Sequence, residues 1–279
     1  MLKLIGDTTS LVYCLFQVRM GTVRVAHTCS KLGLCDNAEK YFKEAELDFP
    51  EGQEIRSHSE FAVLLRKKTE IILDSYEFRW PLDEMGVQEI LSQANKDLLR
   101  AEEILSYPFR FKQQIALTKK EKARLSILMR NYNNAYNDIR SALNILPRYC
   151  DYLKADFLLV KSDAERGRNL ANRSKESLET AENIYQNTFG DDHPVIAVTL
   201  QKKCSLHLDF EHKSNTGKNE AHKYFEASHQ ACEVLKSNLE QQLAGVQTDF
   251  LKNYSFERHH ILKRQKSLHK RLTRNQGAW

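Results

Sequence analysis

The stretch that decides the fold is Ala135–Pro147, which reads AYNDIRSALNILP. It places a small residue, a bulky residue, a second small residue and a proline at offsets of 0, 4, 7 and 12. The same offsets recur about a hundred residues earlier in Ala38–Pro50, AEKYFKEAELDFP. Self-similar segments are the signature of repeat architectures, and a proline ends a helix because it lacks a backbone N–H. The sequence therefore predicts repeated helices that end at a proline.

Both stretches resemble the second helix of a tetratricopeptide (TPR) repeat. In that repeat, alanines sit where two helices cross closely, a bulky residue fills the space between them, and a proline ends the second helix. Two further segments keep the offsets of 4 and 7, namely Ala94, Leu98 and Ala101, and Ala221, Phe225 and Ser228. FGDDHP at residues 189–194 resembles the turn between repeats in kinesin light-chain-type TPRs. The aromatic-x-x-Leu-Gly signature of first helices is poorly kept, so the resemblance is to a divergent array.

The resemblance implies an all-α fold, a right-handed TPR-like superhelix (an α-α solenoid) with a long C-terminal capping helix. About five helix pairs are expected over residues 20–235, after a packing helix or partial repeat at 1–19 and before a C-terminal helix and basic tail at 236–279. Only five prolines and ten glycines interrupt the chain, which favours long helices over a sheet. The expected helix bounds include Ser59–Phe78, Val87–Leu105, Tyr149–Glu165, a start near Lys175, and Pro194–His212.

Cysteine usage and hydropathy restrict the class of protein. The six cysteines are scattered without a C-x2-C pair, which argues against a zinc site and against a dense disulfide framework. The apolar run at residues 11–18 is far shorter than the roughly 20 residues of a membrane span. The residues around it lack the pattern of a signal peptide. We therefore expect no membrane span and a location in the cytoplasm or nucleus.

The sequence holds no motif of a known catalytic site. Phosphate-loop, nucleophile-elbow, dinucleotide-binding and H-E-x-x-H patterns are all missing from it. Asp191, Asp192 and His193 offer three metal-ligand groups, but a glycine, two aspartates and Pro194 are more typical of a helix end followed by a helix start. His259, His260 and His269 lack a neighbouring cysteine or carboxylate cluster. We expect a protein that is not an enzyme and uses no cofactor or metal.

The resemblance also implies a binding site, because TPR proteins commonly hold a peptide on the concave wall built from first helices. The repeat's groove positions correspond here to Val23, His27, Lys31, Lys120, Arg124, Ile127, Leu159, Asp163, Gln201 and Ser205. This mixed set does not reproduce the Lys and Asn clamp with which some TPR cochaperones hold a C-terminal carboxylate. The expected function is a non-enzymatic scaffold or adaptor that binds a partner peptide or helix.

The C-terminal tail is basic while the rest of the chain is balanced. Residues 256–279 hold one acid, Glu257, and seven cations: Arg258, Lys263, Arg264, Lys266, Lys270, Arg271 and Arg274. Such a segment can act in nuclear import or bind an acidic partner, and it can equally be a solvated cap. Few aromatic side chains are interleaved with these cations, so nucleic-acid binding is not expected. An alternative function is a regulatory or targeting domain of a larger enzyme or motor complex.

Overall fold

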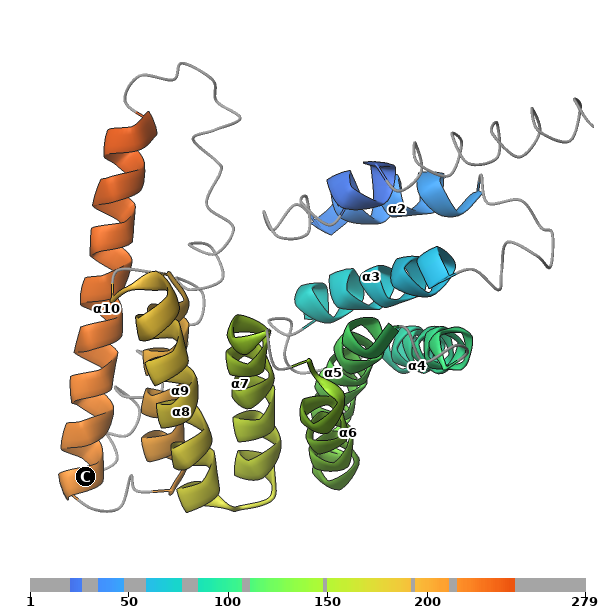
Figure 1. Cartoon of the computed structure of the whole chain (residues 1–279). Helices are drawn as coiled ribbons and strands as arrows, with labels where there is room; N and C mark the ends of the chain where they lie inside the picture. The colour runs from blue at the N-terminus through green and yellow to red at the C-terminus, as the bar shows by residue number, and fades with distance from the viewer. Residues whose placement is uncertain are drawn as a thin grey trace, which may run out of the picture. The chain divides into compact units, whose positions relative to one another are not determined.

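The computed structural model describes residues 21–26, 35–47, 59–76, 85–106, 111–147, 150–191, 194–210 and 215–243. Regular secondary structure in these ranges is helical, and no strand occurs in them (Figure 1). The predicted all-α class is therefore confirmed. The chain divides into two compact units, Met1–Phe109 and Arg110–Trp279.

The first unit contains α2 (Cys35–Leu47), α3 (Ser59–Tyr76) and α4 (Met85–Leu105). Helices α3 and α4 pack as a pair, and α2 contacts α3. The predicted small, bulky, small face of α4 is fully buried at Ala94, Leu98 and Ala101. The Thr69 hydroxyl of α3 lies 3.5 Å from the Ala94 carbonyl oxygen, so the two helix backbones approach closely at the first alanine.

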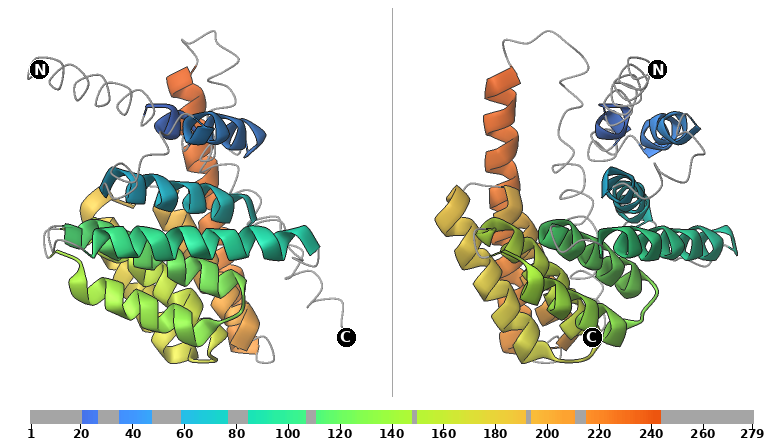
Figure 2. Two further views of the ribbon diagram at one scale, coloured as in Figure 1. Left: turned by 90° about the vertical axis from the view of Figure 1, so that its right-hand side faces the viewer. Right: turned by 45° about the vertical axis from the view of Figure 1, so that its right-hand side comes forward.

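The described residues of the second unit form three successive helix pairs. Its helices are α5 (Lys112–Leu128), α6 (Tyr132–Ile145), α7 (Asp151–Gly167), α8 (Ala171–Phe189), α9 (Pro194–Phe210) and α10 (Asn215–Leu243). The closest packing is within the pairs α5–α6, α7–α8 and α9–α10, and each pair also packs against the next. Figures 1 and 2 show these helices side by side, with α10 continuing past the end of α9. One helix thus crosses the boundary predicted at residues 235 and 236.

Two turns of this unit repeat the same backbone geometry. Arg130 between α5 and α6 has φ 57°, and Asn169 between α7 and α8 has φ 60°. The next backbone N–H reaches back to the preceding helix in both turns, from Asn131 to Ser126 O at 2.7 Å and from Leu170 to Glu165 O at 2.9 Å. Each residue of the second turn lies 39 positions after its counterpart in the first. Helix pairs α5–α6 and α7–α8 are therefore structural repeats of one another.

The same shift of 39 residues reveals a core face that the sequence analysis missed. It places Ser174, Leu178 and Ala181 on the positions of Ala135, Ile139 and Ala142, and all six side chains are buried. The start predicted near Lys175 was wrong, because α8 begins at Ala171. Its N-cap residue is Leu170, which has no side-chain acceptor for the free N–H groups, so the usual polar signal of a helix start is missing.

Two glycines are required by the geometry of this unit. Gly190 ends α8 with φ 82° and ψ 173°, a conformation that is essentially restricted to glycine, and α9 starts at Pro194. This agrees with the helix end and restart predicted for FGDDHP. At Gly167, an added Cβ atom would lie 2.2 Å from Cδ1 of Tyr132. The end of α7 therefore needs a residue without a side chain where it meets the start of α6.

The core between α7 and α8 contains a polar link as well as apolar contacts. The hydroxyl of the buried Tyr185 donates a hydrogen bond to Asp156. Burial, and then the nearby charge of Asp156, raise the pKa of Tyr185, so its hydroxyl stays protonated and can keep donating.

In the described ranges, no helix combines the length and the apolar character needed to cross a membrane.

Candidate functional site

The predicted groove residues of α5 take part in contacts within the helix array. Glu121 is fully buried, and its carboxylate lies 3.2 Å from Lys120 Nζ and 2.8 Å from Arg124 Nη1. Lys120 Nζ also lies 5.9 Å from the ring centre of Phe157 in α7. Ile127 is half-buried against the apolar cluster of the α5–α6 pair. The two cations therefore balance a buried acid, and Lys120 also connects α5 to α7.

The predicted groove residues of α7 and α9 are buried or paired. Leu159, Gln201 and Ser205 are buried. Asp163 forms ion pairs with Lys202 of α9 and, at 3.6 Å, with Arg166 of its own helix. The pair of Asp163 and Lys202 joins α7 to α9, as Lys120 joins α5 to α7. We call the three helices α5, α7 and α9 the first-helix wall.

Most of the other predicted site residues lie outside the part of the chain that the structure describes. His27, Lys31, Asp192, His193 and the whole basic tail lie outside the described residues. Val23 is described and buried, and Asp191 is described and exposed. Within the described ranges, no group of three His, Cys, Asp or Glu side chains is arranged to hold a metal ion.

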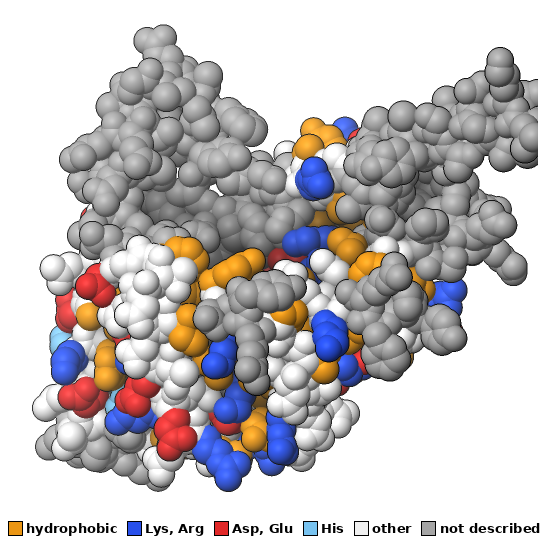
Figure 3. All heavy atoms as spheres, viewed as in Figure 1, with side chains coloured by type: hydrophobic (Ala, Val, Ile, Leu, Met, Phe, Trp, Pro, Cys, Tyr) orange, Lys and Arg blue, Asp and Glu red, His pale blue; other side chains and the backbone are white. Residues whose placement is uncertain are grey.

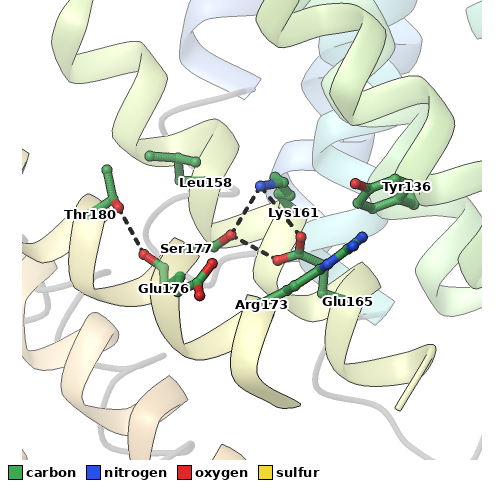
Figure 4. A pocket seen from close by; sticks show the side chains of 8 residues that line it. All are labelled: Tyr136, Leu158, Lys161, Glu165, Arg173, Glu176, Ser177 and Thr180. Carbon is green, nitrogen blue, oxygen red and sulfur yellow. Dashed lines mark hydrogen bonds and ion pairs between the residues drawn. The ribbon is translucent and has the colours of Figure 1, made fainter. Parts of the chain in front are cut away.

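A cavity of about 310 Å³ opens between α6, α7 and α8, and we call it the α6–α8 cavity. Figure 4 shows the eight side chains that line it. They are Tyr136 of α6, Leu158, Lys161 and Glu165 of α7, and Arg173, Glu176, Ser177 and Thr180 of α8. Its volume is at the small end of the range for ligand pockets, which suits one amino-acid side chain better than a large cofactor.

A buried polar network forms one side of this cavity (Figure 4). Ser177 is buried, and its hydroxyl donates to Glu165 Oε2 at 2.7 Å while it accepts from Lys161 Nζ at 3.3 Å. Lys161 Nζ also lies 3.3 Å from Glu165 Oε1. Glu165 is 1% exposed, and among the described residues Lys161 is the cation that compensates its charge. A buried carboxylate without such a partner costs several kcal/mol.

Two arginines beside the cavity do not take part in this hydrogen-bond network. Arg173 is exposed and forms no hydrogen bond or ion pair with the described part of the chain. Figure 4 shows its guanidinium group extended toward Tyr136. The guanidinium carbon of Arg168 lies 4.3 Å from the ring centre of Tyr136, which is a cation–π distance. Glu176 is the exposed acid on the rim of the cavity.

The turn that leads into α8 adds to this positive character. Residues 166–175 contain Arg166, Arg168, Arg173 and Lys175 and no acid. Figure 3 shows Lys and Arg side chains gathered along the lower edge of the unit, where Figure 1 draws the α7–α8 turn. The N-terminus of α8 faces the same turn, and its helix dipole contributes a partial positive charge.

The sequence analysis did not identify any residue of this cavity. Its members come from three helices and from positions 136 to 180, so no short motif contains them. One local signal was available, because Lys161 and Glu165 stand four residues apart on one helix. Such pairs are common on solvated helix faces, and the sequence does not show that Glu165 is buried. The burial of this pair is a property of the α7–α8 packing.

Comparison with known proteins adds no family. No protein-family model matches this sequence, and a search of curated proteins finds no similar sequence either. The resemblance to TPR repeats therefore depends on the residues and turns described above.

Proposed function

We propose that this chain is a non-enzymatic scaffold that holds a segment of a partner protein against the first-helix wall of a divergent, right-handed TPR-like superhelix. The observation that carries this proposal is the repetition of one helix pair after 39 residues, with the same turn and the same buried face. An array of such pairs exposes a large surface for the size of its core, which suits recognition of extended segments.

The side chains of the wall support binding more than catalysis. Lys120 and Arg124 pair with the buried Glu121, and Asp163 pairs with Lys202, so these charged residues of the predicted groove are compensated. General acid–base chemistry instead needs a titratable group poised near the operating pH and open to a substrate. A compensated polar surface is suited to binding the backbone and side chains of a partner segment.

The proposal is tested by selecting peptides from a displayed library against the intact folded chain, with the urea-unfolded chain as the control target. We expect a sequence family that binds the folded chain alone. Hydrogen exchange with the enriched peptide should then protect amides of α5, α7 and α9. Failure to enrich any family over the unfolded control would contradict a scaffold role. Protection confined to α6 and α8 would contradict the proposed location on the wall.

A further inference from the structure

The α6–α8 cavity is separate from the predicted groove, since none of the groove residues lines it. Its network leaves donor capacity unused. An ammonium group has three N–H donors, and Lys161 donates one to Ser177 while a second can face Glu165 Oε1. The third N–H has no acceptor among the described residues. Arg173, on the same cavity, has five N–H donors and no partner in that part of the chain.

The charges around the cavity favour one added negative charge. In the lining itself, Lys161 and Arg173 balance Glu165 and Glu176. Arg168, whose guanidinium group lies over the ring of the lining residue Tyr136, brings the formal charge of the cavity and its border to +1. A single carboxylate would bring this sum to zero. A phosphate group carries nearly two negative charges, so it would leave an excess of negative charge beside Glu176. The cavity is therefore better matched to a carboxylate than to a phosphate.

The remaining lining is suited to a short carbon chain. Leu158 and the ring of Tyr136 offer apolar surface beside the polar network. Figure 4 shows Leu158 and Tyr136 on either side of Lys161. A Glu or Asp side chain has this combination of a short apolar stem and a charged end.

We propose that the α6–α8 cavity binds an acidic side chain of a partner protein segment, with the carboxylate between Lys161 and Arg173. Arginine and carboxylate groups form paired, charge-assisted hydrogen bonds, and the lysine adds a third donor. Arg168, Arg173 and Lys175 of the turn at residues 166–175 attract the acidic segment before the side chain enters, whereas Arg166 is paired with Asp163 and Asp209. This binding does not require a peptide on the first-helix wall, so it adds a second recognition site to the scaffold.

The test uses the full chain labelled with ¹³C in its leucine methyl groups and titrated with capped tetraglutamate. The Leu158 signals are assigned by their loss in Leu158→Ile. We expect them to shift saturably with tetraglutamate and to stay fixed with capped tetraglutamine. Arg173→Gln should weaken tetraglutamate binding about tenfold or more, as expected for a lost charge-assisted contact. Arg173 is exposed and forms no hydrogen bond or ion pair with the described part of the chain, so this variant should remain folded.

The matched control is Arg140→Gln, which removes an exposed cation from α6 outside the cavity lining. It should bind tetraglutamate as the unmodified chain does. Equal weakening by Arg140→Gln and Arg173→Gln would show general charge attraction and overturn the proposed site. A capped phosphoserine peptide that moves Leu158 while tetraglutamate does not would overturn the preference for a carboxylate. If the peptide library shows no binding to α5, α7 and α9, the tetraglutamate test of the α6–α8 cavity still stands on its own.

Discussion

Helix pairs α5–α6 and α7–α8 have the same backbone arrangement, but each compensates the charge of a buried acid in a different way. Glu121 is compensated within its own helix by Lys120 and Arg124. Glu165 has Lys161 as its cation and takes a hydrogen bond from Ser177 of the second helix. The first arrangement is a redundant internal charge cluster. The second connects the two helices of the pair and lies beside an open cavity.

This difference shows how a repeat can gain a site without a change in fold. The face made of a small, a bulky and a second small residue is buried in both pairs, so both pairs bury the same helix-crossing face. The buried acids instead occupy positions that do not correspond under the shift of 39 residues. Recognition chemistry can therefore vary between repeats while the crossing residues stay fixed.

The largest predicted effect follows from the number of cations beside each buried acid. Glu121 has two, Lys120 and Arg124, whereas Lys161 is the cation found beside Glu165 in the described residues. Lys161→Met should destabilise the chain by about 3 kcal/mol, because it leaves a buried carboxylate without a cation. Lys120→Met should cost about 1 kcal/mol, since Arg124 remains 2.8 Å from Glu121. Urea unfolding followed by circular dichroism measures both values.

Two controls accompany this comparison. Lys161→Arg keeps the charge and should retain most of the stability. Replacing Glu165 with Gln in the Lys161→Met background should recover much of the loss, because the uncompensated charge is then gone. Equal losses from Lys161→Met and Lys120→Met would contradict the contrast between the two pairs.

The next effect tests whether the two pairs cross in the same way. Ala142 and Ala181 correspond under the shift of 39 residues and are both fully buried. Ala142→Leu and Ala181→Leu should each cost about 1 to 3 kcal/mol by overpacking. Arg140→Leu, at an exposed position of α6, is the control and should have little effect. If only one alanine is sensitive in thermal unfolding, the pairs do not share one crossing.

A smaller loss is expected where α7 meets α6. Gly167→Ala would place a methyl group against the ring of Tyr132, so a cost of about 1 to 2 kcal/mol is expected. The same change should cost less in a Tyr132→Ala background, because the ring that it meets is absent. A double-mutant cycle from melting temperatures measures this coupling. Additive losses would show that the contact with Tyr132 does not explain the requirement for glycine.

The sequence predicted the parts of this fold that depend on local patterns. The helical class, the crossing face at Ala135, Ile139 and Ala142, and the glycine turn before Pro194 each have a short-range physical cause. The start of α8 could not be read, because Leu170 gives no capping signal and Ser174 replaces the first alanine. Local sequence patterns therefore predicted that the second helices exist better than they predicted where those helices begin and end.

The candidate site was less predictable than the fold. Groove positions carried over from the TPR resemblance fall on residues such as Asp163 and Gln201, which the array holds in an ion pair or buries. The cavity residues Lys161, Arg173 and Ser177 have no sequence motif, because their meeting depends on how α6, α7 and α8 pack. Which charges remain unpaired is a three-dimensional property that one sequence does not show.

The smallest predicted effect concerns the two left-handed turn residues. Asparagine tolerates φ near 60° better than other residues with a side chain, and glycine has no steric penalty there. At both Arg130 and Asn169, the Gly and Asn forms should therefore be more stable than the Ala form by about 0.5 to 1 kcal/mol. Comparison with Arg130→Ala removes the effect of lost arginine contacts, since the Gly, Asn and Ala variants all lack them. The same order of melting temperatures at both positions would support one shared turn, whereas opposite orders would show that the two turns differ in strain despite their matching φ angles.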